Sequence, residues 1–223
     1  MKIGVLGTGT VAQTLGRKFA SLGRGVMLGS RTPDNAAAAA FVADVGRGTG
    51  QGTFAQAAAF GDVLVNATAG GASLAALGTT DPGVCDGKVL IDVANPLDFS
   101  GGFPPVLSVC NDDSLAEQIQ RAHPHLRVVK SLNTMAAHVM VDPGRLAGES
   151  AVFLSGDDAA AKSTVRNLLK EMGWSESSMI DLGDITSARG TEMLLPLWLR
   201  LFGALGTGDL NLAVVRNAND RSG

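Results

Sequence analysis

The stretch KIGVLGTGTVAQTLGRKFASLG, residues 2–23, decides the fold that this sequence predicts. Its apolar start is typical of a buried strand, and Gly7, Gly9 and Ala12 follow in the G-x-G-x-x-G/A spacing. Apolar residues then recur at helical spacing until Gly23. Gly7 permits a tight turn, Gly9 lets the backbone approach a pyrophosphate, and Ala12 keeps helix and strand close. The alternative interpretation is a structural turn in a chain with 29 glycines.

A dinucleotide bound at such a turn places its pyrophosphate on the free N–H groups at the start of the helix. The sequence therefore predicts a cofactor-binding segment over residues 7–12, namely Gly7, Thr8, Gly9, Thr10, Val11 and Ala12.

The next predicted strand ends in GVMLGSR, residues 25–31, where a dinucleotide site usually carries an acidic residue for the ribose. Ser30 and Arg31 stand there instead. A carboxylate would repel the 2′-phosphate of NADP, whereas a guanidinium and hydroxyl groups can donate to it. The sequence thus predicts NADP rather than NAD, with Thr8 and Thr32 as further phosphate ligands. Alternatively, Arg31 is a solvated surface charge.

Short apolar strands alternate with helical segments along the chain, which indicates a Rossmann-type, doubly wound and mainly parallel sheet. We expect an NADP-binding domain over residues 1–148 and a C-terminal subdomain over 149–223. One helix should begin with Thr32 as N-cap and Pro33 in its first turn, another at Ser114, and a long apolar helix near Thr186. The expected strands are Lys2–Leu6, Gly25–Gly29, Gln51–Thr53, Asp62–Ala67, Lys88–Asp92, Arg127–Ser131, Ala151–Ser155 and Ser178–Leu182.

Composition excludes several classes. The 223 residues are 45% hydrophobic, enough for a sizeable core, and a net charge of -3 without a basic stripe argues against nucleic acid. Cys85 and Cys110 lie far apart, so we expect no disulfide framework and no metal site, and a reducing cytoplasm. The start of the chain is too short an apolar run for a secretory signal, and Leu194–Gly206, with Pro196 and Arg200, is too short for a membrane span.

Loops after three later strands should hold the rest of the ligand, because ligands bind at the carboxyl ends of strands in such sheets. Each could also be ordinary turn chemistry. The candidates are Asn66, Ala67 and Thr68 after the fourth strand, Asn95 and Pro96 after the fifth, and Asn133, Thr134, Met135 and Ala136 after the sixth.

Acid–base chemistry has few candidates here. The chain has no tyrosine, which excludes a tyrosine–lysine alcohol dehydrogenase mechanism, and it has no GxSxG elbow. Its three histidines are His123, His125 and His138, and His138 has no obvious carboxylate partner in the sequence. The sequence therefore predicts a redox cofactor without an evident acid for reducing a carbonyl.

The chain resembles the family of coenzyme F420-dependent NADP oxidoreductases over nearly its whole length, through GVLGTGTVAQTLGRKFASLG, GSRTPD, DVANPL, VVKSLNTMAA and LGDITSARGTEMLLPLWLRLFGALG. Members of that family pass a hydride between NADPH and a deazaflavin, and membrane ferric reductases of the STEAP type pass it to a flavin. The resemblance implies NADP across the carboxyl edge of the sheet, bound through Thr8, Ser30 and Arg31. It also implies that C-terminal helices wall off a second cofactor.

The implied deazaflavin pocket maps to the loop Asn133, Thr134, Met135, Ala136 and Ala137, and to Glu192, Leu195, Leu205 and Gly206. Deazaflavin reducers of the family tend to have His-Thr-Ile/Val-Pro where this chain has Asn133-Thr134-Met135-Ala136. The sequence thus departs from the family on the acceptor side.

Three functions follow from these features. The first is hydride transfer between NADPH and F420 or a flavin, with Asn133, Thr134, Ala136 and Ala137 at the reacting rings. The second is reduction of an imine or carbonyl, with His138 or Glu192 as proton donor. The third is a non-catalytic NADPH sensor that docks a partner through its last helix. We also expect a homodimer that buries Leu194–Phe202.

Overall fold

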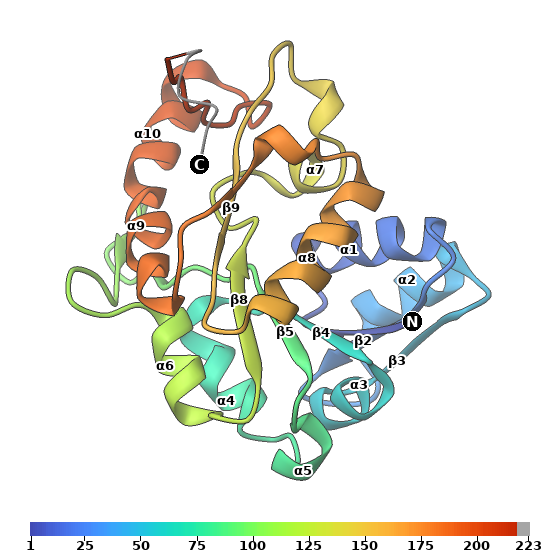
Figure 1. Ribbon diagram of the computed structural model, residues 1–223. Helices are drawn as coiled ribbons and strands as arrows, with labels where there is room; N and C mark the ends of the chain where they lie inside the picture. Colours follow the sequence, from blue (N-terminus) through green and yellow to red (C-terminus); the bar gives the residue numbers. More distant parts are fainter. Residues whose placement is uncertain (218–223) are drawn as a thin grey trace.

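A single eight-stranded sheet organises the computed structural model, which describes residues 1–217. The strand order is β10-β9-β8-β5-β4-β1-β2-β3 (Figure 1). All neighbouring strands are parallel except β8 and β9, where Lys130 pairs with Ser155 in an antiparallel register. The strands are β1 Lys2–Leu6, β2 Gly25–Ser30, β3 Thr49–Thr53, β4 Val63–Asn66, β5 Val89–Asp92, β8 Arg127–Ser131, β9 Val152–Ser155 and β10 Met179–Asp181.

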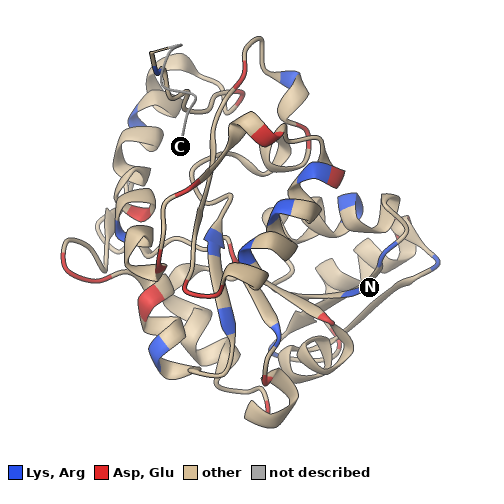
Figure 2. Ribbon diagram, in the orientation of Figure 1, with Lys and Arg blue, Asp and Glu red and all other residues tan. Residues whose placement is uncertain are grey.

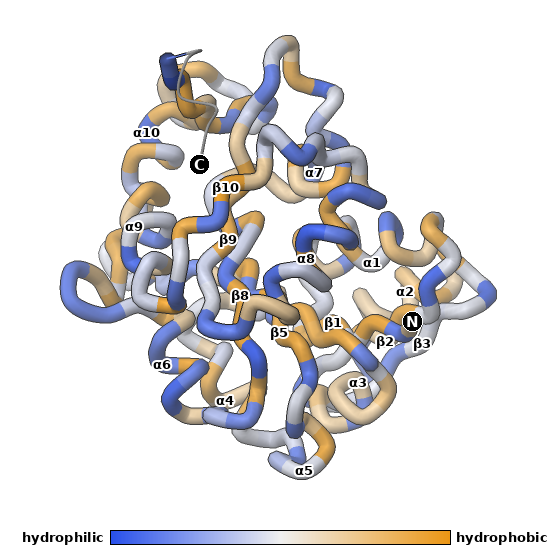
Figure 3. The backbone as a smooth tube through the Cα atoms, in the orientation of Figure 1, coloured by the Kyte–Doolittle hydropathy of each residue, from blue (hydrophilic) through white to orange (hydrophobic). Residues whose placement is uncertain are grey.

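Side chains of the central strands alternate between two buried clusters, as the two-residue period of a strand dictates. In β4, Val63 and Val65 join one cluster and Leu64 the other. The central strands are accordingly hydrophobic over much of their length (Figure 3), although β4 ends in Asn66 and β5 in Asp92. The first cluster is covered by α1 Thr10–Ser21, α2 Ala36–Val45, α7 Ala137–Val141 and α8 Ala159–Met172, and the second by α3 Phe54–Phe60, α4 Ser73–Leu77, α5 Pro82–Cys85 and α6 Leu115–Ala122.

Helix starts follow side-chain capping. Ser114 caps α6 as predicted, because its hydroxyl accepts from the N–H of Glu117. The predicted start of the second helix at Thr32 and Pro33 is wrong. Asn35 caps α2 instead, with its side-chain oxygen accepting from the N–H of Ala38 at 3.0 Å.

The prediction of one long C-terminal helix beginning near Thr186 is also corrected. It consists of α9, Ala188–Met193, and α10, Leu195–Leu205, while Thr186 lies in a short 3-10 turn, η4 Ile185–Ser187. Pro196 occupies the first turn of α10 and lacks the N–H that would continue α9. Only Leu195 of α10 is buried within the chain, so this apolar helix is not covered by its own sheet.

The sequence pattern did not predict the short helices α3, α4 and α5, nor the two-residue strands β6 Leu97–Asp98 and β7 Val106–Leu107, which form an antiparallel pair. The remaining 3-10 turns are η1 Gly70–Ala72, η2 Pro143–Arg145 and η3 Glu176–Ser178. The predicted domain boundary at residue 148 falls between η2 and β9, and β9 and β10 extend the same sheet. The division into two domains stays a prediction.

The predicted fold class is confirmed: a Rossmann-type, mostly parallel sheet with helices on both faces and a helical C-terminal part. Lysines and arginines are interspersed with acidic residues rather than gathered on one element (Figure 2). No helix within residues 1–217 is long and apolar enough to cross a membrane.

Candidate functional site

The turn after β1 brings two strand ends into close contact. Gly7 has a φ of 129°, and a Cβ on it would lie 2.4 Å from the carbonyl oxygen of Ala67. Its N–H donates to the carbonyl of Gly29 at 2.9 Å. A glycine is required here because both the backbone conformation and the contact exclude a side chain.

The start of α1 is open to a ligand. Gly9 is its N-cap, and within the described chain no side chain caps the first-turn N–H groups of Thr10, Val11 and Ala12. A Cβ on Gly9 would meet no atom within 4 Å. Uncapped N–H groups beside a side-chain-free position form a cradle for an anion, so the segment fits a dinucleotide pyrophosphate.

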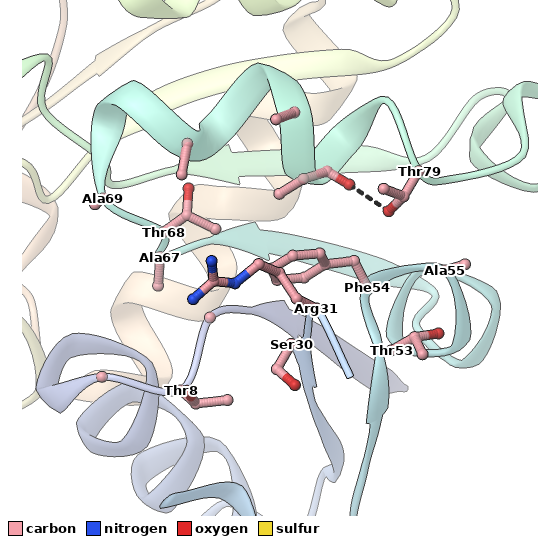
Figure 4. A pocket seen from close by; sticks show the side chains of 15 residues that line it. Thr8, Ser30, Arg31, Thr53, Phe54, Ala55, Ala67, Thr68, Ala69 and Thr79 are labelled. Carbon is pink, nitrogen blue, oxygen red and sulfur yellow. Dashed lines mark hydrogen bonds between the residues drawn. The ribbon is translucent and has the colours of Figure 1, made fainter. Parts of the chain in front are cut away.

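A cavity of about 860 Å³ lies in front of this turn, a volume typical of ligand sites. Arg31 extends across it toward Thr68, and Phe54 lies behind the arginine side chain (Figure 4). The cavity is lined by Gly7, Thr8, Gly9, Ser30, Arg31, Thr53, Phe54, Ala55, Ala67, Thr68, Ala69, Ala72, Ala75, Ala76 and Thr79.

Ser30, Arg31 and Thr32 differ in whether their side chains are free to bind a ligand. The Ser30 hydroxyl is turned inward, donating to the carbonyl of Thr32 and accepting from its N–H. The exposed Arg31 guanidinium has no ion pair or hydrogen bond to another described residue. Thr32 lines an adjoining cavity of about 410 Å³ together with Thr8 and Asn35. Ser30 thus shapes the turn, and Arg31 is the cation that remains available.

One side of the cavity consists of residues that no sequence-based prediction indicated. Thr53, Phe54 and Ala55 lie at the junction of β3 and α3. Ala72, Ala75 and Ala76 come from the η1–α4 segment, and Thr79 follows it. A signal was present in the first case, because Thr53 and Gln56 form a capping box that fixes the start of α3. The alanines of α4 carry no polar pattern, so the sequence gave no signal for this part of the cavity.

Asn66, predicted to bind cofactor, is fully buried at the end of β4. Its amide donates to Asp92 Oδ1 at 2.8 Å and to the Ser73 hydroxyl at 3.0 Å, and its Oδ1 accepts from Thr68 Oγ1 at 2.7 Å. Asn66 therefore supports Thr68 from behind, whereas Thr68 and Ala67 line the cavity.

Glu192, also predicted to bind the second cofactor, is held in a buried ion-pair cluster. Lys130 Nζ lies 2.8 Å from Glu192 Oε1 and 2.9 Å from Asp92 Oδ2. The Glu192 carboxylate also accepts from the N–H groups of Leu115 and Ala116 at the start of α6. This arrangement ties α9 to both β8 and α6.

The charges in this cluster are set by burial and pairing together. Burial by itself lowers the pKa of Lys130, but the carboxylates of Asp92 and Glu192 outweigh it, so the pKa of Lys130 is raised. Burial raises the pKa of Glu192, and the attraction of Lys130 offsets only part of that effect. The ammonium group is therefore retained.

Asn133 and Asn95 form a reciprocal pair between the loops after β8 and β5. Asn95 Nδ2 donates to the carbonyl of Asn133, and Asn133 Nδ2 donates to Asn95 Oδ1, both at 2.9 Å. Asn133 Nδ2 also donates to the carbonyl of Thr191 in α9. The amide hydrogens of Asn133 are thus used inside the protein, and the residue fixes the loop that continues into Thr134, Ala136 and Ala137.

His138 has a carboxylate partner that the sequence did not reveal: its Nε2 lies 2.8 Å from Asp209 Oδ1. The other predicted acceptor residues are dispersed. Leu195 is buried, Leu205 is 61% exposed, and Gly206 ends α10 in a left-handed conformation. None of the residues lining the large cavity comes from residues 95–96, from 133–137 or from α9 and α10.

Comparison with known proteins gives three results. A family model described as NADP oxidoreductase, coenzyme F420-dependent, matches residues 2–96. The crystal structure of a candidate F420-dependent NADP reductase from Arthrobacter sp. FB24 is 50% identical, with a TM-score of 0.91, covering 97% of this chain and 100% of that one. Metalloreductase STEAP3 of Rattus norvegicus is 28% identical over 201 residues, or 88% of this chain, which spans 38% of that relative's length.

More distant structures share the fold alone. A reductive aminase from Aspergillus terreus, solved with NADPH and ethyl-5-oxohexanoate, is 19% identical with a TM-score of 0.65. The match covers 92% of this chain and 62% of that chain.

Proposed function

This chain belongs to the F420-dependent NADP oxidoreductase family and is an NADP-dependent oxidoreductase, and on that premise we propose that it passes a hydride between NADPH and a deazaflavin such as F420, or a flavin. The observation that carries the proposal is the cavity at the start of α1, where Arg31 stands in place of an acidic residue.

The residues of this cavity suit NADP. Gly7, Thr8 and Gly9 with the open N-terminus of α1 would hold the pyrophosphate, and Arg31 with Thr32 would hold the 2′-phosphate. When bound, NADPH supplies the hydride. Ala67 and Thr68 at the end of β4 would continue the site toward the loops after β5 and β8.

The proposed acceptor site depends on the positions of two loops and of α9. Asn95 and Asn133 lock two loops together, and Lys130 with Glu192 holds α9 beside them. Such a rigid frame orients Thr134, Ala136 and Ala137 beside the reacting rings and excludes water, which hydride transfer between planar rings requires more than a titrating group. In this proposal Asn133 and Glu192 act through other residues, and Leu195, Leu205 and Gly206 belong to the C-terminal wall.

An anaerobic assay tests the proposal: NADPH oxidation is followed with F420, with FMN and without acceptor, and the series is repeated with NADH. We expect rapid reduction of F420 or FMN by NADPH and little by NADH. Reduction of FMN alone would mean that the Asn133–Ala136 departure from the family has changed the acceptor. Tight NADPH binding without oxidation by either acceptor would favour a non-catalytic sensor.

A second candidate, reduction of an imine or carbonyl, is favoured by one observation, the 2.8 Å contact between His138 Nε2 and Asp209 Oδ1. Such a reaction needs a positioned proton donor, and an imidazole beside a carboxylate is an arrangement used for that role. Glu192 is unsuited to the role because its oxygens are held by Lys130 and by the backbone of α6. Turnover of a cyclic imine or ketone that is lost in His138→Gln would support this candidate.

The exposed apolar face of α10 supports a homodimer as the assembled form. Leu197 and Phe202 are 51% and 39% exposed, and exposed apolar surface of this kind is typical of interfaces. The cytoplasmic location expected from the cysteine count stays a prediction.

A further inference from the structure

Thr68, in the wall of the large cavity, stands at the end of a chain of hydrogen bonds that begins at a buried cation. Lys130 Nζ donates to Asp92 Oδ2 at 2.9 Å, and Asp92 Oδ1 accepts from Asn66 Nδ2 at 2.8 Å. These three side chains belong to residues that are at most 1% exposed. Asn66 in turn contacts Thr68 and Ser73. The chain therefore decides which hydrogen-bonding atoms Thr68 has left for a ligand.

The side-chain amide of Asn66 has one permitted orientation. A carboxylate paired with an ammonium group accepts hydrogen bonds and donates none, so the amide nitrogen of Asn66 faces Asp92. The second N–H of this amide donates to the Ser73 hydroxyl at 3.0 Å. Both amide hydrogens are thus used, and the amide oxygen faces Thr68.

The hydroxyl hydrogen of Thr68 is used inside the protein. Thr68 Oγ1 donates it to Asn66 Oδ1 at 2.7 Å. Ser73 Oγ lies 2.8 Å from Thr68 Oγ1, and Ser73 is the donor at this contact because the single hydrogen of the Thr68 hydroxyl is already engaged. A hydroxyl oxygen has two acceptor lone pairs. The contacts within residues 1–217 therefore leave Thr68 one lone pair and no hydrogen for a ligand.

A ligand group at the Thr68 hydroxyl must therefore be a hydrogen-bond donor. The ionised oxygens of a phosphate have no hydrogen to donate, and they would face a lone pair, whereas a sugar hydroxyl can donate. Arg31, which the proposed function pairs with the 2′-phosphate, extends across the cavity toward Thr68 (Figure 4). The ribose that carries this phosphate is joined to adenine and to the pyrophosphate at two other carbons, so its one free hydroxyl is the 3′-hydroxyl.

We infer that Thr68 accepts a hydrogen bond from the 3′-hydroxyl of the adenosine ribose of NADPH and disfavours a phosphate oxygen at the same place. This inference rests on the proposed function, which places NADP in the cavity at the start of α1. It assigns Thr68 a fixed hydrogen-bonding polarity, which the buried pairing of Asn66 with Asp92 imposes.

Two small probes isolate this contact from hydride transfer. Adenosine 2′,5′-bisphosphate carries the 2′-phosphate and the 3′-hydroxyl, and its 3′-deoxy analogue lacks only that hydroxyl. We expect isothermal titration of the unmodified protein to show about threefold to tenfold weaker binding of the 3′-deoxy probe, the effect of one neutral hydrogen bond. The 3′-fluoro analogue, which cannot donate, should bind as weakly as the 3′-deoxy probe.

A threonine pair tests the assignment to Thr68. Thr68→Val keeps the side-chain shape without the hydroxyl, so the ratio of the two dissociation constants should fall to about one, with binding of the 3′-deoxy probe unchanged. Thr68→Ser retains the hydroxyl and should retain the ratio. Thr79→Val is the matched control, because Thr79 lines the same cavity from the other end of the η1–α4 segment. Its hydroxyl donates to the carbonyl of Ala76 at 2.7 Å, and its loss should leave the ratio unchanged.

The outcomes separate this inference from the proposed function. Equal affinities of the unmodified protein for the 3′-hydroxyl and 3′-deoxy probes, or a ratio that Thr68→Val leaves unchanged, would overturn the contact. Equal losses for both probes in Thr68→Val would also overturn it, because a contact with the 3′-hydroxyl alone predicts a split. Hydride transfer to F420 or FMN would then leave the proposed function intact.

The reverse result is also distinguishable. A ratio that falls to about one in Thr68→Val, in a protein whose bound NADPH neither F420 nor FMN oxidises, would support the contact and contradict the proposed hydride transfer. If the unmodified protein binds neither probe, NADP does not occupy this cavity, and the inference fails with that placement.

Discussion

Lys130 and Glu192 join the sheet to the C-terminal helices through a contact of 2.8 Å, and both side chains are at most 1% exposed. Asp92 shares the same ammonium group at 2.9 Å, so one cation serves two buried carboxylates. Buried ion pairs of this kind add little net stability over an apolar core, but losing one partner is costly. The pair therefore acts as a constraint on where α9 lies.

Replacing Lys130 with methionine should destabilise the protein by about 3–5 kcal/mol, because two buried carboxylates would lose their cation. Urea unfolding at neutral pH measures the effect. Lys170→Met, which removes a partner of the exposed Glu176, is the control and should cost about 0–1 kcal/mol. A loss of unfolding free energy in Lys130→Met no larger than in the control would contradict the role of Lys130 as the cation of the two buried carboxylates.

The same variant should regain stability as the pH falls. Burial already raises the pKa of Glu192, and Lys130 is the main group that lowers it, so its removal raises the pKa further. A carboxyl whose folded pKa is raised contributes stability below its unfolded pKa of 4.5 and loses that contribution as the pH rises through the folded pKa. The difference in unfolding free energy between Lys130→Met and the unmodified protein should thus be smaller near pH 4.5 than at pH 8. A difference independent of pH would contradict this linkage.

Arg31→Ala should weaken NADPH binding by roughly tenfold to a hundredfold, since a charge-assisted hydrogen bond contributes about 1.5–3 kcal/mol. Binding of NADH should be unchanged, because it lacks the 2′-phosphate. Isothermal titration with both nucleotides measures this, and Arg47→Ala, in the exposed turn after α2, controls for loss of general positive charge. Equal losses of NADPH and NADH affinity in Arg31→Ala would show that Arg31 does not bind the 2′-phosphate.

Gly9→Ala should leave stability intact and weaken NADPH binding by about tenfold or more. Its Cβ would meet no protein atom within 4 Å, so the methyl group would fill only the space in front of the α1 N-terminus. Gly4→Ala provides the opposite control, because its Cβ would lie 2.1 Å from the carbonyl oxygen of Ala57 where α3 packs on β1. That variant should unfold at lower temperature in the absence of nucleotide. Normal NADPH affinity in Gly9→Ala would place the pyrophosphate elsewhere.

The features that the sequence predicted well depend on residues that are close together along the chain. The bounds of β1 and β8 match the prediction, because each is a buried strand flanked by turn signals. The cavity lies beside the strand–turn–helix segment with its glycine spacing, because Gly7, Thr8 and Gly9 line it. The start of α2 was mispredicted because Thr32-Pro33 and Asn35 both carry helix-start chemistry, and only tertiary context decides between them.

What the sequence did not predict depends on residues far apart in the chain. The pairing of Lys130 with Glu192 and of His138 with Asp209 forms only when the C-terminal segment folds back onto the sheet. The two-residue strands β6 and β7 are too short to show a period. The reversed direction of β9 gave no signal because parallel and antiparallel strands buried on both faces have the same apolar pattern.

Phe202→Asp should convert a dimer into monomers. Phe202 stacks on Trp198 with ring centroids 5.5 Å apart, and the pair stands on a helix of which only Leu195 is buried within the chain. Aromatic residues at the centre of an interface contribute about 2 kcal/mol or more, so the dimer dissociation constant should rise by about thirtyfold or more. Light scattering at micromolar concentration should give twice the chain mass of 22.7 kDa for the unmodified protein and a lower mass for the variant. Phe103→Asp is the matched control, because Phe103 is 66% exposed on the turn between β6 and β7, away from α10 in sequence. A monomeric unmodified protein, or a dimer that Phe103→Asp disrupts and Phe202→Asp does not, would show that α10 is not the interface.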